Sequence, residues 1–340
     1  MDFCREVSLE PGIPGWKRDV FSFVRLFLDP AEGAISQKTS GTTGDPKLYV
    51  LKRDSMICSA RKTIQFFELQ PGDRALLCLP MRYIAGKMMV VRALVGGLDL
   101  VMAEPSARPL KKLNGSVDFG AMVPLQVHES IQHRDDLSLV ERLLIGGGEL
   151  HPSIKEELTR HGSTAVYESF AMTETYTHFA LKRINGERPD DDFRLLDGVS
   201  VTLDERGCLV VDVPGVTDGA VSTNDLVEIT PSGRGFRWLG RYDNVIKSGG
   251  IKIVPEMLEQ QITRLIGNRC LVLPEKDTKL GEKLTLLVEY GEPDPPVNAW
   301  LDLLHKELSG YEVPKRIVTV KEIPRNQSFK PDRGAARIFL

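Results

Sequence analysis

The feature that most constrains this chain is a run of eleven residues, 37–47, with the sequence QKTSGTTGDPK. It combines hydroxyl side chains with two glycines and two lysines. Glycines allow successive backbone N–H groups to turn toward an anion, hydroxyls add donors, and lysine adds a mobile positive charge. The run therefore predicts a phosphate-binding loop, although Thr-Gly-Asp-Pro also suits a polar hairpin turn.

The residues after this loop exclude one common kind of phosphate site. The apolar run LYVL at 48–51 favours a strand over a helix, and the spacing G-x-x-x-x-G-K is absent. The loop is therefore not a Walker-type P-loop, and a different nucleotide-binding family is indicated.

Length and composition describe an ordinary globular protein. The 340 residues are enough for roughly two domains, with 41% hydrophobic and 27% charged residues. The net charge of −3 does not favour nucleic acid as a partner. Five widely spaced cysteines without a C-x-x-C pair indicate neither a disulfide framework nor a zinc site. The charged start and the lack of a long apolar run predict a cytoplasmic protein without a membrane span.

The pattern of elements predicts an α/β fold. Helical and strand-like segments alternate up to about residue 195, which implies a large N-terminal domain with a wound sheet. Helices are expected at 20–28, 52–67, 84–95 and 137–143, and strands at 74–79, 98–102, 119–123, 144–148 and 164–166. Closely spaced strands from 199 to 229 predict a small β-rich subdomain, and a compact α+β pattern follows. We expect a boundary at about Asp243, which gives domains at 1–242 and 243–340.

Three further segments carry residues suited to chemistry. The segment YESFAMTET at 167–175 follows a predicted strand and suits a Mg²⁺ site, although a helix N-terminus is an equal alternative. The segment GRYDNVIKSGG at 240–250 suits a hinge or a solvated hairpin. The loop PRNQSFK at 324–330 carries a lysine that, taken alone, favours a surface position.

In this order, the segments resemble the adenylate-forming superfamily of acyl-CoA synthetases, nonribosomal-peptide adenylation domains and luciferases. The match extends from about residue 37 to residue 333. The resemblance implies a mobile C-terminal domain and the use of ATP, Mg²⁺ and CoA. It implies ATP contacts from Thr39, Ser40, Gly41, Thr42, Thr43, Gly44, Lys47, Gly147, Gly148, Glu149, Asp225 and Arg241.

The resemblance also assigns catalytic roles. Thr173 lies on the α-phosphate side, Glu174 on Mg²⁺, and Lys330 at the position of the C-terminal catalytic lysine. Asp243 matches the hinge, and Gly249 and Gly250 match the face that meets CoA. The implied reaction is activation of a small-molecule carboxylic acid as an acyl-adenylate, followed by transfer to the CoA thiol.

Within the superfamily, residues 172–182 and 80–86 are most similar to the o-succinylbenzoate–CoA ligases of menaquinone synthesis. For that acid we expect Arg82 or Lys87 to meet the spare carboxylate. The side chains expected along the ring are those of Tyr83, Phe170 and His178. Tyr83 stands where many relatives have histidine, Ala171 replaces the motif glycine, and Phe329 replaces the glycine before Lys330.

Other functions stay open on sequence alone. The same chemistry could act on another acid or on a carrier-protein thiol. Only 38 residues precede the phosphate loop, which is short for the superfamily, so a truncated, non-catalytic nucleotide-binding protein is an alternative and a homodimer is one allowed state. Retention of the charges at 174, 225 and 330 argues for catalysis.

Overall fold

The computed structural model of the chain describes residues 12–38, 48–133, 136–148, 150, 152–160, 162–325 and 331–340. The predicted phosphate loop at 39–47, Glu149 and Lys330 lie outside these described residues. The chain divides into two compact units. Unit 1 is Met1–Val201, Val211–Val221 and Thr230–Phe236, and unit 2 is Thr202–Val210, Ser222–Ile229 and Arg237–Leu340. The expected boundary at about Asp243 stays a prediction.

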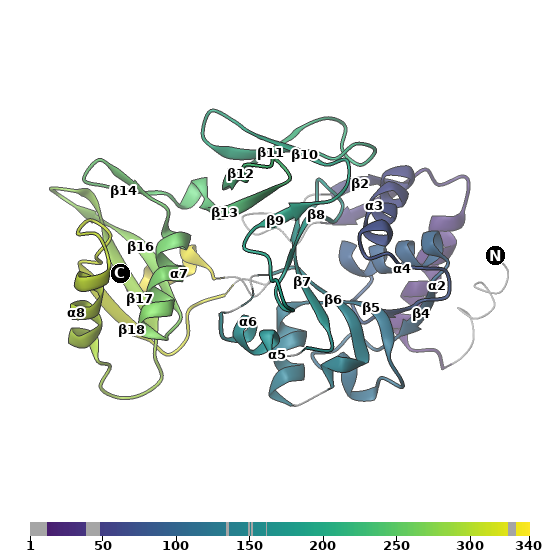
Figure 1. The fold of residues 1–340 in the computed structure, drawn as a ribbon, viewed down its shortest axis with the longest axis horizontal. Coiled ribbons are helices and arrows are strands. Elements are labelled where there is room, and N and C mark those ends of the chain that lie inside the picture. Colours follow the sequence, from purple (N-terminus) through teal and green to yellow (C-terminus); the bar gives the residue numbers. More distant parts are fainter. Residues whose placement is uncertain are drawn as a thin grey trace. The chain divides into compact units, whose positions relative to one another are not determined.

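A mixed sheet runs through unit 1 (Figure 1). Of the eleven described strands of this sheet, seven are β3 (Arg74–Leu77), β4 (Asp99–Met102), β5 (Val117–Met122), β6 (Val140–Ile145), β7 (Ala165–Ala171), β8 (His178–Arg183) and β9 (Phe193–Leu195). The order is β9-β8-β7-β6-β5-β3-β4. Strands β4, β3, β5, β6 and β7 are parallel, whereas β8 and β9 pair antiparallel. The wound α/β sheet predicted from the alternating elements is therefore confirmed as a mixed sheet.

Helices and one hairpin complete the described part of unit 1. The helices are α2 (Gly15–Leu28), α3 (Arg53–Phe66), α4 (Ile84–Gly96), α5 (Pro124–Gln132) and α6 (Pro152–Thr159). Helix α3 packs on α4, and α4 packs on β3. Strands β1 (Ala34–Lys38) and β2 (Leu48–Lys52) pair antiparallel on either side of residues 39–47.

One predicted helix is wrong. Residues 137–143 do not form a helix, because Leu137–Leu139 is a 3-10 turn and Val140–Ile145 is strand β6. The helix of this region, α5, lies earlier and begins at Pro124, a residue whose missing N–H costs nothing in the first turn. A short apolar run such as VERLLI fits a buried strand as well as a helix, so its periodicity did not decide between them.

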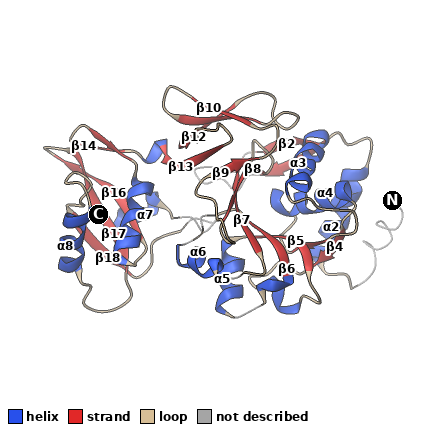
Figure 2. Ribbon diagram, viewed as in Figure 1, coloured by secondary structure: helices blue, strands red, loops and turns tan. Residues whose placement is uncertain are grey.

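Unit 2 contains most of the β-rich subdomain and a second sheet. The first four strands are β10 (Ser200–Leu203), β11 (Cys208–Asp212), β12 (Val221–Ile229) and β13 (Gly235–Arg241), in the order β10-β11-β12-β13. The second sheet has strands β14 (Ile246–Ser248), β15 (Ile251–Ile253), β16 (Cys270–Asp277), β17 (Gly281–Glu289) and β18 (Arg316–Val320). Helices α7 (Pro255–Ile266) and α8 (Val297–Glu307) accompany it (Figure 2). The short helix α9 (Arg333–Ala336) follows β18 in the chain.

The first half of β16, in the second sheet, is buried on both faces. Cys270 and Val272 of β16 point into a cluster with Leu258 of α7 and Trp300 of α8. Leu271 and Leu273, which alternate with Cys270 and Val272 along the strand, lie in a separate cluster that includes Ala336 of α9. This alternation is the period of two expected of a strand covered on both sides.

The described cysteines Cys58, Cys78, Cys208 and Cys270 are free. None of the helices that the structure describes is long and apolar enough to cross a membrane.

Candidate active site

The two turns that follow β6 and β7 hold the motif residues of unit 1. Gly146, Gly147 and Gly148 come directly after β6, and residues 172–177 come after β7. Because β6 and β7 are parallel neighbours, both turns lie at the same edge of the sheet, where α/β proteins bind ligands. Here β7 continues to Ala171 and turns into β8, so the helix-cap interpretation of this segment is wrong.

The glycine turn is shaped by close packing. A Cβ at Gly146 would lie 2.5 Å from the Ser169 hydroxyl of β7, and Gly147 has φ of 82°, a conformation that other residues rarely adopt. The Ser169 hydroxyl donates to the Ile145 carbonyl over 3.1 Å. The close approach of Ser169 and the positive φ thus give local reasons for glycine at 146 and 147, and the predicted ATP contacts of Gly147 and Gly148 stay a prediction.

Glu174 is the carboxylate of the second turn. Its Oε1 accepts a hydrogen bond from the Tyr49 hydroxyl of β2 at 3.0 Å, and this bond raises the pKa of Tyr49. The carbonyl of Thr173 accepts from the Tyr176 amide at 3.0 Å, which closes the turn. The described residues contain no group of three or more His, Cys, Asp or Glu that could hold a metal ion. An exposed single carboxylate fits a Mg²⁺ that keeps most of its waters and shares the ligand phosphates.

The residues expected to meet the acid are already engaged with the protein. Lys87 donates to Gln37 Oε1 at 2.7 Å, and burial lowers the pKa of Lys87. The Arg82 guanidinium lies 4.8 Å from the centre of the Tyr83 ring. Gln37 also donates to the Arg82 carbonyl over 2.9 Å, so this segment is tied to β1.

Phe170 and His178 lie in different surroundings. Phe170 packs edge-on against Phe179, Phe193 and Phe236 with centroid separations of 5.1–5.6 Å. His178 is buried, and its Nε2 lies 3.2 Å from the Thr63 hydroxyl of α3. Burial and the nearby charge of Arg92 hold the pKa of His178 well below its usual value, so the ring is neutral at pH 7.

Arg92 is the residue that sequence reasoning missed. It lies on α4 and is only 2% exposed, yet among the described residues its Nε has no hydrogen-bond partner, and its Nη1 donates to the Met89 sulfur at 3.4 Å. Burial lowers the pKa of Arg92 to about 10, which leaves it charged at neutral pH. Among the residues that the structure describes, no carboxylate pairs with it. A single arginine inside the apolar helix sequence MMVVRALV was the available signal.

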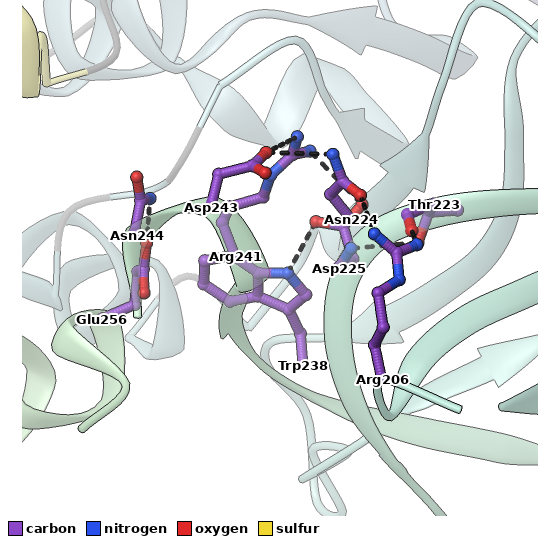
Figure 3. Close-up of polar contacts among 9 residues, drawn as sticks. All are labelled: Arg206, Thr223, Asn224, Asp225, Trp238, Arg241, Asp243, Asn244 and Glu256. Atoms are coloured by element: carbon purple, nitrogen blue, oxygen red, sulfur yellow. Dashed lines mark hydrogen bonds and ion pairs between the residues drawn. The ribbon is translucent and has the colours of Figure 1, made fainter. Parts of the chain in front are cut away.

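Asp225 of unit 2 is held by two donors from β13 (Figure 3). Trp238 Nε1 donates to Oδ1 at 3.0 Å, and Arg241 Nη1 lies 3.5 Å from Oδ2. The Asp225 amide donates to the Thr223 hydroxyl at 3.0 Å. The carboxylate is nearly buried, with its side chain 12% exposed.

A second set of contacts surrounds Asp243. Its Oδ2 accepts from Asn224 Nδ2 at 3.0 Å and lies 3.5 Å from Arg241 Nη2. Arg206, from the turn between β10 and β11, donates to the Asn224 side chain at 2.8 Å and to the Thr223 carbonyl at 2.9 Å (Figure 3). Asp225, one of the predicted ATP contacts, and Asp243, the predicted hinge residue, thus belong to one polar network.

Two glutamates of α7 meet Arg333 in the interior of unit 2. Arg333 Nη2 lies 2.8 Å from Glu259 Oε2 and 3.5 Å from Glu256 Oε1, and Asn244 also donates to Glu256. Glu259 accepts from the Val272 amide at 2.7 Å. Burial raises the pKa of Glu259 to about 8, although Arg333 and this amide act against the rise.

The two glycines expected to meet CoA form a tight hairpin turn. Gly249 and Gly250 join β14 to β15 with φ of 57° and 84°. Two-residue hairpins with positive φ at both positions favour glycine, which gives a local reason for this pair. Their predicted role toward CoA is not tested by this geometry.

Comparison with known proteins gives the family. The AMP-binding enzyme family model matches residues 23–219. A crystal structure of an acyl-CoA synthetase (AMP-forming)/AMP-acid ligase II-like protein from Dyadobacter fermentans is 34% identical, covers 99% of this chain and 97% of that chain, and has a TM-score of 0.67. The chain therefore belongs to the AMP-binding enzyme family, the adenylate-forming superfamily that its motifs resemble.

Two other relatives are more distant. The 2-succinylbenzoate–CoA ligase of Salmonella typhimurium is 25% identical over 89% of this chain and 68% of its own length. ATP-bound MatB from Rhodopseudomonas palustris, 21% identical, covers 89% of this chain and 67% of its own and has a TM-score of 0.74, which shows a shared fold. AMP-forming acid–CoA ligases are thus the class of enzyme to which this chain is similar.

Proposed function

We propose that this chain is an AMP-forming acid–thiol ligase that acts on an aromatic dicarboxylic acid, 2-succinylbenzoate, and passes the acyl group to CoA. In the first step a substrate carboxylate oxygen bonds to the α-phosphorus of ATP and pyrophosphate leaves. In the second step the CoA sulfur bonds to the acyl carbon and AMP leaves. The family and the resemblance to 2-succinylbenzoate–CoA ligases at about a quarter identity support this proposal.

The chain's own residues would divide the work. The 39–47 loop would hold the β- and γ-phosphates, and Lys330 would offset the charge that gathers at the α-phosphate. Glu174, oriented by Tyr49, would hold Mg²⁺. When bound, that ion neutralises phosphate charge. Asp225 would accept hydrogen bonds from the ribose hydroxyls. Gly147 and Gly148 would leave the backbone open to adenine.

The observation that carries the choice of acid is Arg92. A buried guanidinium without a carboxylate among the described residues is costly, because the charge has lost water and gained no counter-ion. A substrate with a second carboxylate supplies that counter-ion. Neutral His178, which lies near the charge of Arg92, contacts the Thr63 hydroxyl, and both are neutral hydrogen-bonding groups. The Ser59 hydroxyl of α3, which contacts Thr177, is another.

We propose this role for Arg92 in place of the roles expected of Arg82 and Lys87. The contacts of Arg82 and Lys87 favour the change. Lys87 already has Gln37 as a close partner, and Arg82 is exposed and rests on Tyr83. An exposed cation in water gains little from one more ion pair. A buried cation such as Arg92, which has no carboxylate partner in the part of the chain that the structure describes, gains much more.

Pyrophosphate release tests the proposal. The acids compared are 2-succinylbenzoate, 4-oxo-4-phenylbutanoate, which lacks the ring carboxylate, and 2-butanoylbenzoate, which lacks the side-chain carboxylate. The wild type should prefer the diacid over either monoacid by at least tenfold in kcat/KM. Arg92→Met should remove that preference and Arg92→Lys should retain part of it, whereas Arg61→Met, an exposed arginine of α3, should match the wild type.

Each of the other outcomes would indicate a different function for this chain. Faster turnover of benzoate or fatty acids would reject the diacid while leaving acid activation in place. Acyl-adenylate formation without thioester from CoA would indicate a carrier-protein thiol. No pyrophosphate release with any acid would favour a non-catalytic nucleotide-binding protein.

A further inference from the structure

We infer that Trp238 is a positioning residue for the nucleotide, because its indole N–H fixes the Asp225 carboxylate that would accept the ribose hydroxyls. This inference rests on the proposed role of Asp225. It concerns how the chain presents that carboxylate, and it gives a function to a half-buried tryptophan that the motif residues leave unexplained.

The geometry of the pair favours positioning. Asp225 lies on β12 and Trp238 on the neighbouring strand β13, and Nε1 to Oδ1 measures 3.0 Å (Figure 3). The indole N–H is a donor only and carries no charge, so it orients the carboxylate without neutralising it. A carboxylate offers about four lone-pair sites. The indole takes one of them and leaves acceptor positions on both oxygens for ligand hydroxyls.

Arg241 cannot hold Asp225 as firmly. Its nitrogens lie 3.5 Å from Asp225 and 3.5 Å from Asp243, so one guanidinium is shared between two carboxylates at long distance. The Arg241 side chain is also 45% exposed, and solvent weakens such pairs. The short contact from a rigid ring is therefore the one that sets the direction of the carboxylate.

A purely structural explanation exists and makes a different prediction. Half-buried tryptophans often place their N–H on a partner simply to satisfy it. In that case replacing the N–H would affect folding, but it would not change how the protein distinguishes ligands by their ribose hydroxyls. The selectivity for those hydroxyls is therefore the quantity to measure.

The experiment is calorimetric binding of AMP and of 2′,3′-dideoxy-AMP to the full-length protein. The readout is the dissociation constant of 2′,3′-dideoxy-AMP divided by that of AMP, which measures the selectivity for the ribose hydroxyls. Trp238→Phe keeps the ring packing and removes the N–H, and it should lower this ratio about tenfold, the loss expected for one hydrogen bond to a charged group. The control Trp300→Phe changes a tryptophan of the separate hydrophobic cluster around α8 and should leave the ratio unchanged.

A second replacement covers the case in which Trp238→Phe does not fold. In a Trp16→Phe, Trp300→Phe background, incorporation of 3-benzothienylalanine changes only position 238, keeps the ring's shape and replaces the N–H by sulfur. It should lower the ratio by a similar factor. Equal weakening of both nucleotides, or an unchanged ratio, would overturn the inference.

Asp225→Asn separates this inference from the proposed function. If Asp225→Asn removes the selectivity while loss of the indole N–H does not, only the role of Trp238 is wrong. If Asp225→Asn retains the full selectivity, Asp225 does not bind the ribose, and the proposed nucleotide site fails as well.

Discussion

The Tyr49 hydroxyl donates to Glu174 Oε1 over 3.0 Å, and this bond joins strand β2 to the turn after β7. A second hydrogen bond lies three residues further along β2, where the Lys52 amide donates to the Tyr176 hydroxyl at 3.2 Å. The strand that leaves the predicted phosphate loop is thus attached to the residue proposed to hold Mg²⁺.

Tyr49→Phe should weaken metal binding without altering the fold. Hydrogen bonds to a ligating carboxylate orient it, and their loss typically lowers metal affinity 10–100-fold. We expect a rise of about that size in the dissociation constant of Mn²⁺, measured by electron paramagnetic resonance with a non-hydrolysable ATP analogue present. The pyrophosphate-release rate should recover at saturating Mg²⁺. Tyr311→Phe, an exposed tyrosine, is the control. An unchanged Mn²⁺ titration would contradict the orienting role.

Arg92→Met should make the free protein more stable. The substitution replaces a buried charge that has no carboxylate partner among the described residues by an apolar side chain of similar length. The free energy of unfolding should therefore rise by about 1–3 kcal/mol. Thermal unfolding without ligand measures this change. Addition of 2-succinylbenzoate should then stabilise the wild type and have little effect on the variant. A less stable variant would mean that Arg92 has a favourable partner in the free protein.

Glu259 should make stability fall as the pH rises. Its folded pKa of about 8 exceeds the ordinary value of 4.5, so between these values the folded state binds the proton and the unfolded state does not. Stability from this group is complete below about pH 4.5 and is lost as the pH approaches 8, by up to about 1.4 kcal/mol per pH unit.

Glu259→Gln imitates the protonated carboxyl and should remove this dependence. The melting temperatures of variant and wild type should be similar at pH 5, and the variant should gain steadily toward pH 8. Glu292→Gln, an exposed glutamate, should follow the wild type. The contrary result is a melting temperature of the variant, relative to that of the wild type, that falls from pH 5 to pH 8. It would mean that Arg333 keeps Glu259 ionised.

Lys330→Ala should separate the two proposed half-reactions. Loss of a preorganised positive charge typically costs 10²–10³ in rate, so pyrophosphate release should fall by about that factor. Conversion of a chemically prepared acyl-adenylate and CoA to thioester should stay near the wild-type rate. Asp243→Pro should do the reverse by fixing φ at the proposed hinge, with Asp243→Ala as the control that removes the carboxylate alone. Equal losses in both half-reactions would reject rotation about Asp243.

The sequence predicted the elements whose apolar period is long or bounded by clear turns. The expected helix at 84–95 is α4, Ile84–Gly96, and the strands expected at 98–102 and 119–123 are β4 and β5. Prediction failed at 137–143, where a six-residue strand and a helix have similar patterns. Helix α5 went unnoticed because its apolar residues are few and its start is marked mainly by Pro124.

The candidate site was less accessible to sequence reasoning because it depends on pairing. Trp238 meets Asp225 only through the alignment of β12 with β13, and Tyr49 meets Glu174 across 125 positions of sequence. No local pattern encodes such contacts. That Arg92 has no carboxylate partner among the described residues is likewise a property of its packed surroundings rather than of its neighbours in sequence.

The alternation along β16 makes its alignment with β17 unusually strict. Sliding β16 by one residue would move Val272 and Leu273 into each other's clusters, so both hydrophobic clusters would be disrupted at once. The same slip would carry Glu275 away from Lys283 and Thr285, which it contacts at 3.0 and 2.8 Å. A strand with one solvent-facing side can tolerate an inserted residue by a local bulge, but residues 270–273 of β16 are buried on both faces. Single-residue insertions within β16 should therefore be among the least tolerated length changes in the described chain.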